Sequence, residues 1–370
     1  MPLPDPVPPR PAALRRGRTG TAHGRRTRGR LPLRRGQPGR QRTVAPGGDP
    51  VSGVEAVRVG VDLGQGGCRA VARHGRSTGH AETPGFWAGD ADARIAEAVA
   101  GALADLGPLG PDPTVLVGVG MTGLNGRPPA TDALRAGLST LGRAGRLRVA
   151  DDSVTAYLGA LGPVAGAVVA AGTGAVALAA DAAGRTARSD GWGADLGDRG
   201  SGHWIGRTAI RLALRDRDRA APGRLADAVT AAWGPVETLP ARWRADPPTP
   251  ERVAGFAATV ADLARAGDDD AGRIWCRAGE LLAESVAGAL FRAGLGAAPV
   301  PVAGTGGVFR ATDLLWPSFT TALRAAAPAA QPVPAAGDPL AGALALADAP
   351  PGPFAALTVQ TDFDAKAEHR

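Results

Sequence analysis

Two glycine turns, each placed between short apolar runs, constrain the fold of this chain more than any other feature. The first turn, at 64–67, follows a β-branched run at 57–62, and the second, at 172–174, separates two further apolar runs. Because glycine lacks a Cβ, such turns let backbone N–H groups approach a phosphate closely. The repetition predicts two α/β halves with a cleft between them, and small molecules commonly bind at such interfaces.

The remaining segments fit the same α/β pattern. Apolar runs predict strands, Ala-rich amphipathic stretches predict helices, and Pro-rich stretches predict loops. We expect strands at 57–62, 68–72, 114–120, 146–150, 165–171, 175–180 and 301–303, and helices at 94–106, 131–141, 201–219 and 338–347. Further helices are expected between 219 and about 293, interrupted by a loop at 235–250, and a linker is expected at 325–336.

The charge of the chain is unevenly distributed. The net charge is +7, and residues 1–50 hold a larger excess of Arg over acidic residues than that, so the rest of the chain is net negative. We therefore predict no nucleic-acid binding by the folded body. Residues 1–50 have few large apolar residues and are expected to be disordered. An RNA-binding tail and an upstream start site of the gene both remain open for this segment.

The composition is that of a soluble globular protein. The 370 residues, 44% hydrophobic and 21% charged, suggest about two domains. The two cysteines, Cys68 and Cys276, cannot form a disulfide framework and fit a reducing cytoplasm. Because no apolar run is long enough to span a bilayer, we expect a cytoplasmic protein without membrane contact.

Acidic residues stand at the ends of two of the predicted strands and suggest phosphoryl transfer. Such a site needs phosphate donors, a carboxylate near the metal and a base for the attacking hydroxyl. Asp62 ends the first strand, and Asp151 and Asp152 follow the strand at 146–150. Asp is also a favoured helix N-cap, so one member of this pair can cap a helix while the other acts as the base.

The order of these motifs resembles that of a known family. It runs from Asp62 through Asp151-Asp152 and the 172–174 turn to the block 191–206, and then to Gly304-Thr305-Gly306-Gly307 and Pro339-Leu340-Ala341-Gly342. This order resembles the N-acetylglucosamine kinase-like proteins of the BadF/BadG/BcrA/BcrD ATPase family, over roughly 57–347. The resemblance implies a two-lobed actin-like ATPase with ribonuclease H-like duplicated domains. The expected parts are a lobe at 54–151, a second lobe at 152–336 that contains a helical insertion, and a helix at 337–350 that returns to the first lobe.

The resemblance also implies ATP and Mg²⁺ as cofactors and a role for particular residues. Asp62 would orient Mg²⁺-bound water, and Asp152 would be the catalytic base that accepts the proton of a sugar hydroxyl. The residues expected to bind the cofactor, besides Asp62, are Gly64, Gly66, Gly67, Gly172, Thr173, Gly174, Gly306 and Gly307. Those expected to bind the sugar are Asp198, Gly193, Asp151 and Asn125.

Several positions depart from the family pattern. The first turn lacks a hydroxyl residue, Ala175 stands where Ser is usual, and Arg199 stands where an acid is usual. The presence of Arg199 suggests an anionic or otherwise different substrate. Trp192 and Trp204 are expected to be packing residues. His203 is expected not to bind metal, since no other ligands have suitable spacing.

Three functions are compatible with these features. The first is ATP-dependent phosphorylation of N-acetylglucosamine or a related hexose or amino sugar. The second is a non-catalytic regulator that binds a sugar or a nucleotide on the same fold. The third is an ATPase activator of the 2-hydroxyacyl-CoA dehydratase type, which Cys68 and Cys276 disfavour because they lack the spacing of iron–sulfur ligands. A homodimer is left open.

Overall fold

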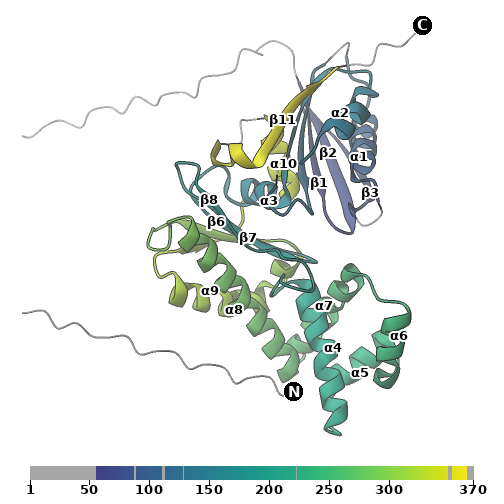
Figure 1. The fold of residues 1–370 in the computed structure, drawn as a ribbon, viewed down its shortest axis with the longest axis vertical. Helices are drawn as coiled ribbons and strands as arrows, with labels where there is room; N and C mark the ends of the chain where they lie inside the picture. The colour runs from purple at the N-terminus through teal and green to yellow at the C-terminus, as the bar shows by residue number, and fades with distance from the viewer. Residues whose placement is uncertain are drawn as a thin grey trace, which may run out of the picture. The chain divides into compact units, whose positions relative to one another are not determined.

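The computed structural model describes residues 56–86, 89–110, 113–127, 129–221, 223–348 and 352–364. The predicted disordered tail, residues 1–50, lies outside the described residues. The folded part contains two mixed β-sheets with helices on their faces, which is the predicted α/β class (Figure 1). No helix in the described ranges is both long and apolar enough to cross a membrane.

The first sheet has six strands in the order β11-β5-β4-β1-β2-β3. Strands β1, β4 and β5 are parallel, while β2, β3 and β11 run antiparallel to their neighbours. The carboxyl ends of the three parallel strands therefore lie at the same edge of the sheet. Asp62 is the second-last residue of β1, and Asp151 is the last residue of β5. The bounds are β1 Val57–Leu63, β2 Gly67–His74, β3 Ser77–Pro84, β4 Val115–Met121, β5 Gly145–Asp151 and β11 Thr358–Phe363.

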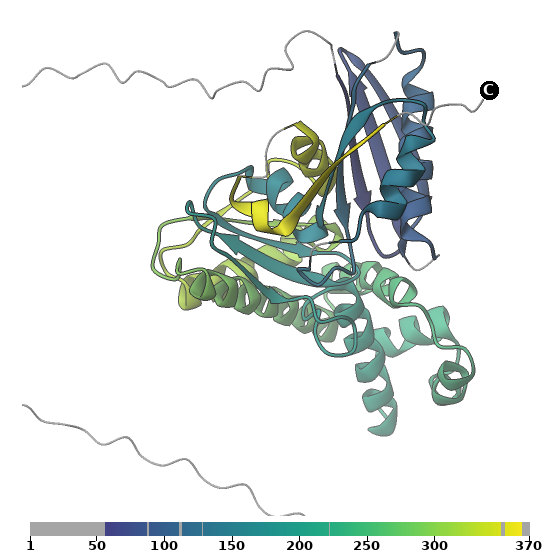
Figure 2. The same cartoon turned by 45° about the horizontal axis from the view of Figure 1, so that its top comes forward.

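Helices cover both faces of this sheet. Helices α1 (Ala91–Leu106) and α2 (Asp132–Ser139) pack with the odd-numbered valines of β1 in one core cluster. Helix α10 (Pro339–Asp348) contacts β1 and β4 (Figure 2). Side chains alternate along a strand, so Gly60 faces α10, and a Cβ there would lie 2.7 Å from the backbone nitrogen of Leu344. The absent side chain allows the helix to lie this close to the sheet.

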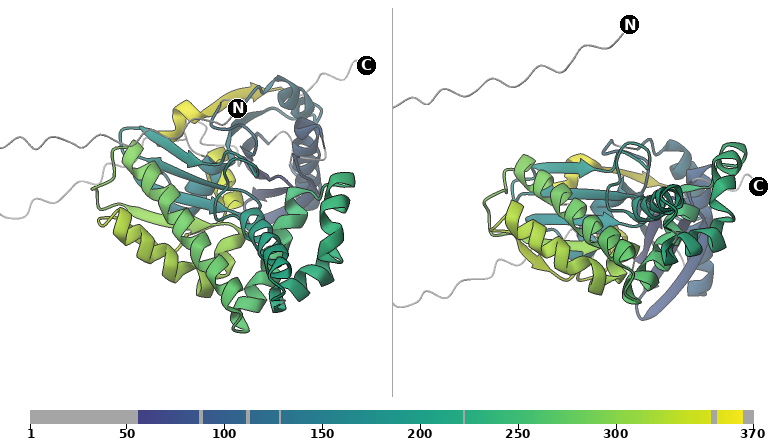
Figure 3. Two further views of the ribbon diagram at one scale, coloured as in Figure 1. Left: turned by 60° about the horizontal axis from the view of Figure 1, so that its bottom comes forward. Right: turned by 90° about the horizontal axis from the view of Figure 1, so that it is seen from below.

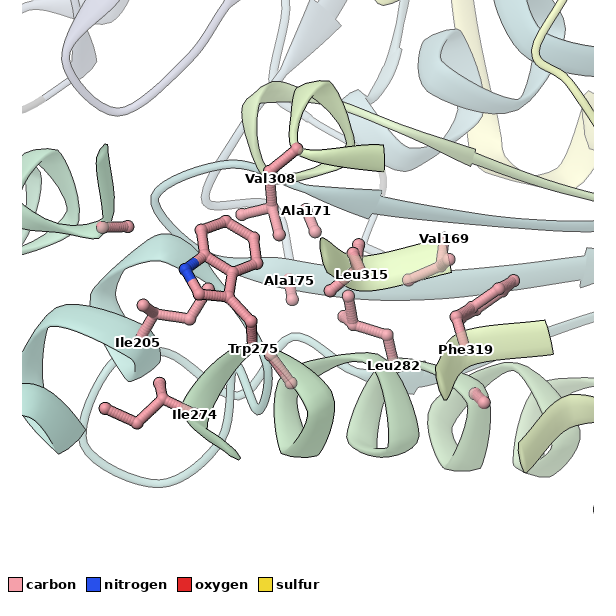
Figure 4. Packing of buried hydrophobic residues seen from close by; sticks show 14 of the residues in the cluster. Val169, Ala171, Ala175, Ile205, Ile274, Trp275, Leu282, Val308, Leu315 and Phe319 are labelled. Carbon is pink, nitrogen blue, oxygen red and sulfur yellow. The ribbon is translucent and has the colours of Figure 1, made fainter. Parts of the chain in front are cut away.

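The second sheet has five strands in the order β10-β9-β6-β7-β8. Helices α4, α8 and α9 pack on one face, where Trp275, Leu282 and Phe319 lie in one core cluster with Val169 and Ala175 (Figure 4). Helix α3 (Asp152–Leu161) contacts strands of both sheets. The bounds are β6 Gly166–Ala171, β7 Ala175–Ala180, β8 Thr186–Asp190, β9 Pro301–Thr305, β10 Gln331–Val333, α4 Gly202–Asp218, α8 Asp269–Arg292 and α9 Thr312–Ala326.

The predicted Pro-rich loop at 235–250 is wrong in its centre. The structure has a short 3-10 helix, Val236–Thr238, followed by α6 (Leu239–Ala245). Pro240 lies in the first turn of α6, where the missing N–H would have no partner in any case, so it does not interrupt the helix. Helices α5 (Arg224–Trp233), α6 and α7 (Pro250–Arg265) form a helical insertion after α4 (Figure 3).

The predicted linker at 325–336 also contains regular structure, because β10 pairs with β9 there. Strands β3 and β11 are further elements that the sequence patterns did not single out. Strand β11 alternates weakly and is an edge strand that pairs only with β5, so its formation depends on that partner more than on its own residues.

Candidate active site

A pocket of about 580 Å³ lies where the ends of the two sheets face each other. The first sheet and its loops provide one wall, and the strands and turns of the second sheet provide the other. The lining residues are Gly64, Gln65, Gly66, Gly67, Phe86, Thr122, Gly123, Asn125, Asp152 and Pro339 on one side, and Ala170–Val176, Arg188, Gly191–Gly193, Asp198 and Gly306 on the other.

Most of the residues predicted from the sequence meet in this pocket. The structure brings together both glycine turns, Asp152, Asp198, Gly193, Asn125 and Gly306. It does not place Asp62, Asp151 or Gly307 in the lining. Asp151 and Gly307 each adjoin a lining residue in the chain, and Asp62 lies two residues before Gly64.

The first glycine turn joins β1 to β2. The amide of Gly64 donates to the carbonyl of Gly67 at 2.8 Å, and a Cβ on Gly67 would meet no atom within 4 Å. The turn is therefore open to a ligand at Gly67, whereas the side chain of Glu251 covers Gly66, where a Cβ would lie 2.8 Å from Glu251 Cγ. Asp62 lies opposite Arg69 across the strands, and its Oδ2 is 2.6 Å from Arg69 Nη2. Burial raises the pKa of Asp62, whereas the hydrogen bond from Arg69 lowers it.

The second glycine turn is held from behind by the start of α4. The amides of Gly202 and His203 donate to the carbonyls of Gly172 and Thr173, at 2.8 and 3.1 Å. The N-terminus of a helix carries a partial positive charge, which favours an anion at this position. Burial lowers the pKa of the His203 imidazole, and Arg207 lowers it further. This histidine is therefore expected to be neutral at physiological pH.

The two acids at the end of β5 have different surroundings. Asp151 caps α3, accepting hydrogen bonds from the amide and the hydroxyl of Ser153, and its Oδ2 accepts from the amide of Gly126 at 3.0 Å. Both carboxylate oxygens of Asp151 are therefore bonded within the protein, which explains why Asp151 does not line the pocket as expected for a residue that binds the sugar. The same contacts also fix the loop that carries Asn125, whose backbone has a φ of 52°.

Asp152, the first residue of α3, faces the pocket. Burial raises the pKa of its carboxyl well above the usual range, and the neighbouring Asp151 and Asp62 raise it further. A hydrogen bond with Thr122 acts in the opposite direction. A carboxylate in such surroundings is a stronger base than an exposed one, as the deprotonation of a hydroxyl requires.

Asp198 lines the pocket but also supports its wall. Its carboxylate accepts hydrogen bonds from the amides of Gly193 and Ala175, and a Cβ on Gly174 would lie 2.6 Å from its Oδ2. Burial raises the pKa of this carboxyl. Asp198 therefore ties the second glycine turn to the loop at 191–197.

The sequence reasoning missed Asp190, which organises this loop. Its buried carboxylate accepts from the amides of Gly191, Asp198 and Arg199 at 2.9, 2.8 and 2.9 Å. Its φ of 62° lies in the left-handed region, which Asp tolerates better than most residues. An Asp directly before the Gly-Trp-Gly run was the only available signal.

Two other sequence expectations differ from the structure. Arg199 does not line the pocket; it pairs with Glu284 at 3.2 Å and lies 3.6 Å from Asp190, so its charge is already compensated. Trp192, expected to be a packing residue, is 69% exposed and lines the pocket. Trp204 does pack against the core of the second sheet.

Comparison with known proteins gives a consistent result. The model of the BadF/BadG/BcrA/BcrD ATPase family matches residues 59–347. An "N-acetylmuramic acid/N-acetylglucosamine kinase" from Clostridium acetobutylicum is 39% identical over 82 residues, which are 22% of this chain and 27% of that protein. The matched stretch thus spans about a quarter of the length of the curated relatives.

Solved structures resemble the chain over a much larger part of its length. A Chromobacterium violaceum protein provisionally assigned as an N-acetylglucosamine kinase has 30% identity and a TM-score of 0.63, covering 79% of this chain and 99% of that one. A glucokinase of the ROK family from Streptomyces griseus, 18% identical with a TM-score of 0.51 over 79% and 98% of the two chains, shares the fold. The glycine turns, the two facing sheets and the match over 59–347 lead to one assignment: this chain belongs to the BadF/BadG/BcrA/BcrD ATPase family.

Proposed function

We propose that this protein uses ATP to phosphorylate a hydroxyl group of a sugar, with N-acetylglucosamine or a related amino sugar as the leading acceptor. The observation that carries the proposal is the position of Asp152, which faces the same pocket as two glycine turns suited to phosphates. Asp152 would accept the proton of the sugar hydroxyl as that oxygen attacks the γ-phosphate. The names of the curated relative and of the Chromobacterium structure support the choice of an amino sugar.

The nucleotide would occupy the glycine-lined end of the pocket. Backbone amides of the turns at 64–67 and 172–174 would contact its phosphates, and the start of α4 would add a favourable field. Gly306, with a φ of 97°, leaves no room for a side chain beside Ala171 and would let the adenosine approach the backbone.

The residues near the first turn fit a Mg·ATP complex. Magnesium bound to a nucleotide keeps most of its ligands from phosphates and water and needs only one or two carboxylates. Asp62 offers a carboxylate whose Oδ2 is held by Arg69, which leaves Oδ1 to orient metal-bound water. The metal would neutralise charge on the phosphates during transfer.

One experiment tests the enzymatic proposal. The full chain is incubated with Mg·ATP and a panel of neutral and acidic sugars, and ADP release is measured. We expect sugar-dependent release that Asp152→Asn lowers by at least about 100-fold, the lower range of general-base contributions. The control is Asp132→Asn, because Asp132 is 97% exposed on α2 and should leave the rate unchanged.

The alternatives predict other results. Sugar binding in calorimetry without ADP release from any sugar would refute the kinase and favour a non-catalytic regulator. An activator of the 2-hydroxyacyl-CoA dehydratase type would contain iron. Cys68 is buried and Cys276 is exposed, and no group of metal ligands forms among the described residues, so we expect none.

A further inference from the structure

Arg188, in the middle of β8, brings a positive charge into the pocket. Among the described residues, it is the only basic one in the lining, which also contains the acids Asp152 and Asp198. Its Cδ lies 3.8 Å from the position that a Cβ would take on Gly126, beside Asn125. The amide of Gly126 is in turn held by Asp151, the neighbour of Asp152. Arg188 is thus at the end of the pocket where the proposed base receives the acceptor.

The guanidinium of Arg188 has donors left over. An arginine carries five N–H donors. Within the described part of the chain, Nη2 donates to the carbonyl of Gly191 at 3.0 Å, and Nε is buried without an acceptor. No described carboxylate lies within ion-pair distance of it. If Arg188 only held the loop at 191–193 in place, its hydrogen bond to the carbonyl of Gly191 would be sufficient, and the side chain would not need to be charged.

Trp192 provides a second feature at the same place. Its side chain is 69% exposed and also lines the pocket, only four residues from Arg188. The buried carboxylate of Asp198 attracts the charge of Arg188, but no ion pair forms between the two described side chains. A large aromatic surface next to a guanidinium without an ion-pair partner is suited to a group that is apolar along its length and negatively charged at its end. The oxygens of a neutral sugar can accept hydrogen bonds from these donors, but they bring no negative charge to pair with the guanidinium.

We infer that Arg188 is a specificity-determining residue whose guanidinium binds a carboxylate carried by the acceptor sugar, while Trp192 covers the apolar part of that substituent. The inference rests on the proposed sugar phosphorylation and narrows its substrate class to acidic amino sugars. Arg188, and not Arg199, is then the residue that binds the negative charge of the substrate, because Arg199 is paired with Glu284 outside the pocket. Arginine suits this role because its planar donors match both oxygens of a carboxylate.

The test compares three acceptors that differ in one substituent: N-acetylglucosamine, N-acetylmuramic acid, which adds a lactyl ether with a free carboxylate, and the methyl ester of that acid. The full chain and its Arg188→Gln, Arg188→Lys and Arg135→Gln variants are assayed for kcat/KM with each acceptor. Arg135 is a half-exposed residue of α2 and provides the control for loss of one surface charge. Melting temperatures show whether each variant is folded.

We expect the wild type to prefer the acid over its ester by at least about 10-fold, as the loss of a charge-assisted contact implies. Arg188→Gln should remove this preference, because it should lower kcat/KM for the acid by about 10-fold more than kcat/KM for the ester or for N-acetylglucosamine. Arg188→Lys should retain part of the preference, because it keeps the charge without the planar donors. If Arg188→Gln fails to fold, Arg188→Lys still has to lower the ratio of kcat/KM for the acid to kcat/KM for the ester.

Equal rates for acid and ester in the wild type, or an equal loss with all three acceptors in the Arg188 variants, would overturn the inference and leave the kinase proposal intact. If no sugar is phosphorylated, the kinase proposal fails, and calorimetry tests Arg188 separately. Binding of the acid but not of the ester, lost in Arg188→Gln, would then support the site. Equal binding of both would refute it.

Discussion

Replacing Asp190 by Ala should destabilise the protein strongly, although this residue does not line the pocket. The substitution removes the acceptor for three backbone amides, those of Gly191, Asp198 and Arg199. Hydrogen bonds to a charged acceptor contribute about 1.5–3 kcal/mol each. The sum is an upper bound, because the amides of the loop at 191–199 can turn partly to water when the carboxylate is absent. Since Asp198 is 4% exposed, at least its amide would remain without a partner. We expect a loss of about 3–5 kcal/mol in the free energy of unfolding, a large part of the usual 5–15 kcal/mol.

Urea unfolding followed by circular dichroism measures this loss, provided that the dependence on urea keeps its slope. Asp190→Asn retains an acceptor at the position of Oδ1, which serves two of the amides, and should lose only about 1–2 kcal/mol. Asp195→Ala, in the same loop, is the control, because its carboxylate is 91% exposed and should contribute less than about 0.5 kcal/mol. If Asp190→Ala unfolds within 1 kcal/mol of this control, the carboxylate does not organise the loop as we describe.

Three further predictions follow from the pocket and the sheet. Because the pKa of Asp152 is raised, kcat/KM of the wild type should rise with pH through a midpoint above the usual carboxyl range, and a midpoint near 4 would contradict the described burial. The raised pKa of Asp152 also makes the stability of the protein depend on pH. The protonated carboxyl contributes stability below pH 3.8, its pKa in the unfolded chain, and this contribution is lost as the pH rises through the pKa of the folded state. Asp152→Asn should therefore raise the melting temperature at pH 7, an advantage that disappears below about pH 4; a variant less stable than wild type at pH 7 would refute this. Gly60→Ala should lower the free energy of unfolding by about 1–3 kcal/mol, because the added Cβ meets Leu344. The control is Gly255→Ala on the exposed side of α7, which should stabilise the protein by about 0.5–1 kcal/mol. Equal effects of the two substitutions in urea unfolding would show that α10 can move away from the sheet.

Local signals in the sequence were sufficient for the parts of the site that depend on local structure. The turns around Gly64–Gly67 and at 172–174 follow from glycines next to apolar runs, and their strands form where these runs predict them. The Asp151-Asp152 pair could be located because it follows a predicted strand, whereas the proposal of Asp152 as the base comes from the resemblance to the family. Asp151 caps α3, which is the local alternative that the Asp-Asp pair had left open.

The rest depends on contacts that no local pattern contains. The partners of Asp190 are eight and nine residues away in a loop without regular structure, and Arg199 is compensated by Glu284 on α8. The exposure of Trp192 results from how that loop lies across the pocket, so its aromatic character alone suggested packing. Helix α6 formed in a Pro-rich stretch because Pro240 falls in its first turn, one of the few positions that tolerate it.

The position of α10 and β11 in the chain has a consequence for synthesis on the ribosome. Strands β1–β5 are translated first, yet their sheet lacks its edge strand, and β1 and β4 lack the helix that covers them, until residues 339–363 have been made. The strands of the second sheet end at Val333 and are therefore available earlier. Domains usually fold in the order in which they are translated. In this protein the half that is translated first is completed last, so its apolar strands need protection from aggregation during nearly the whole of translation.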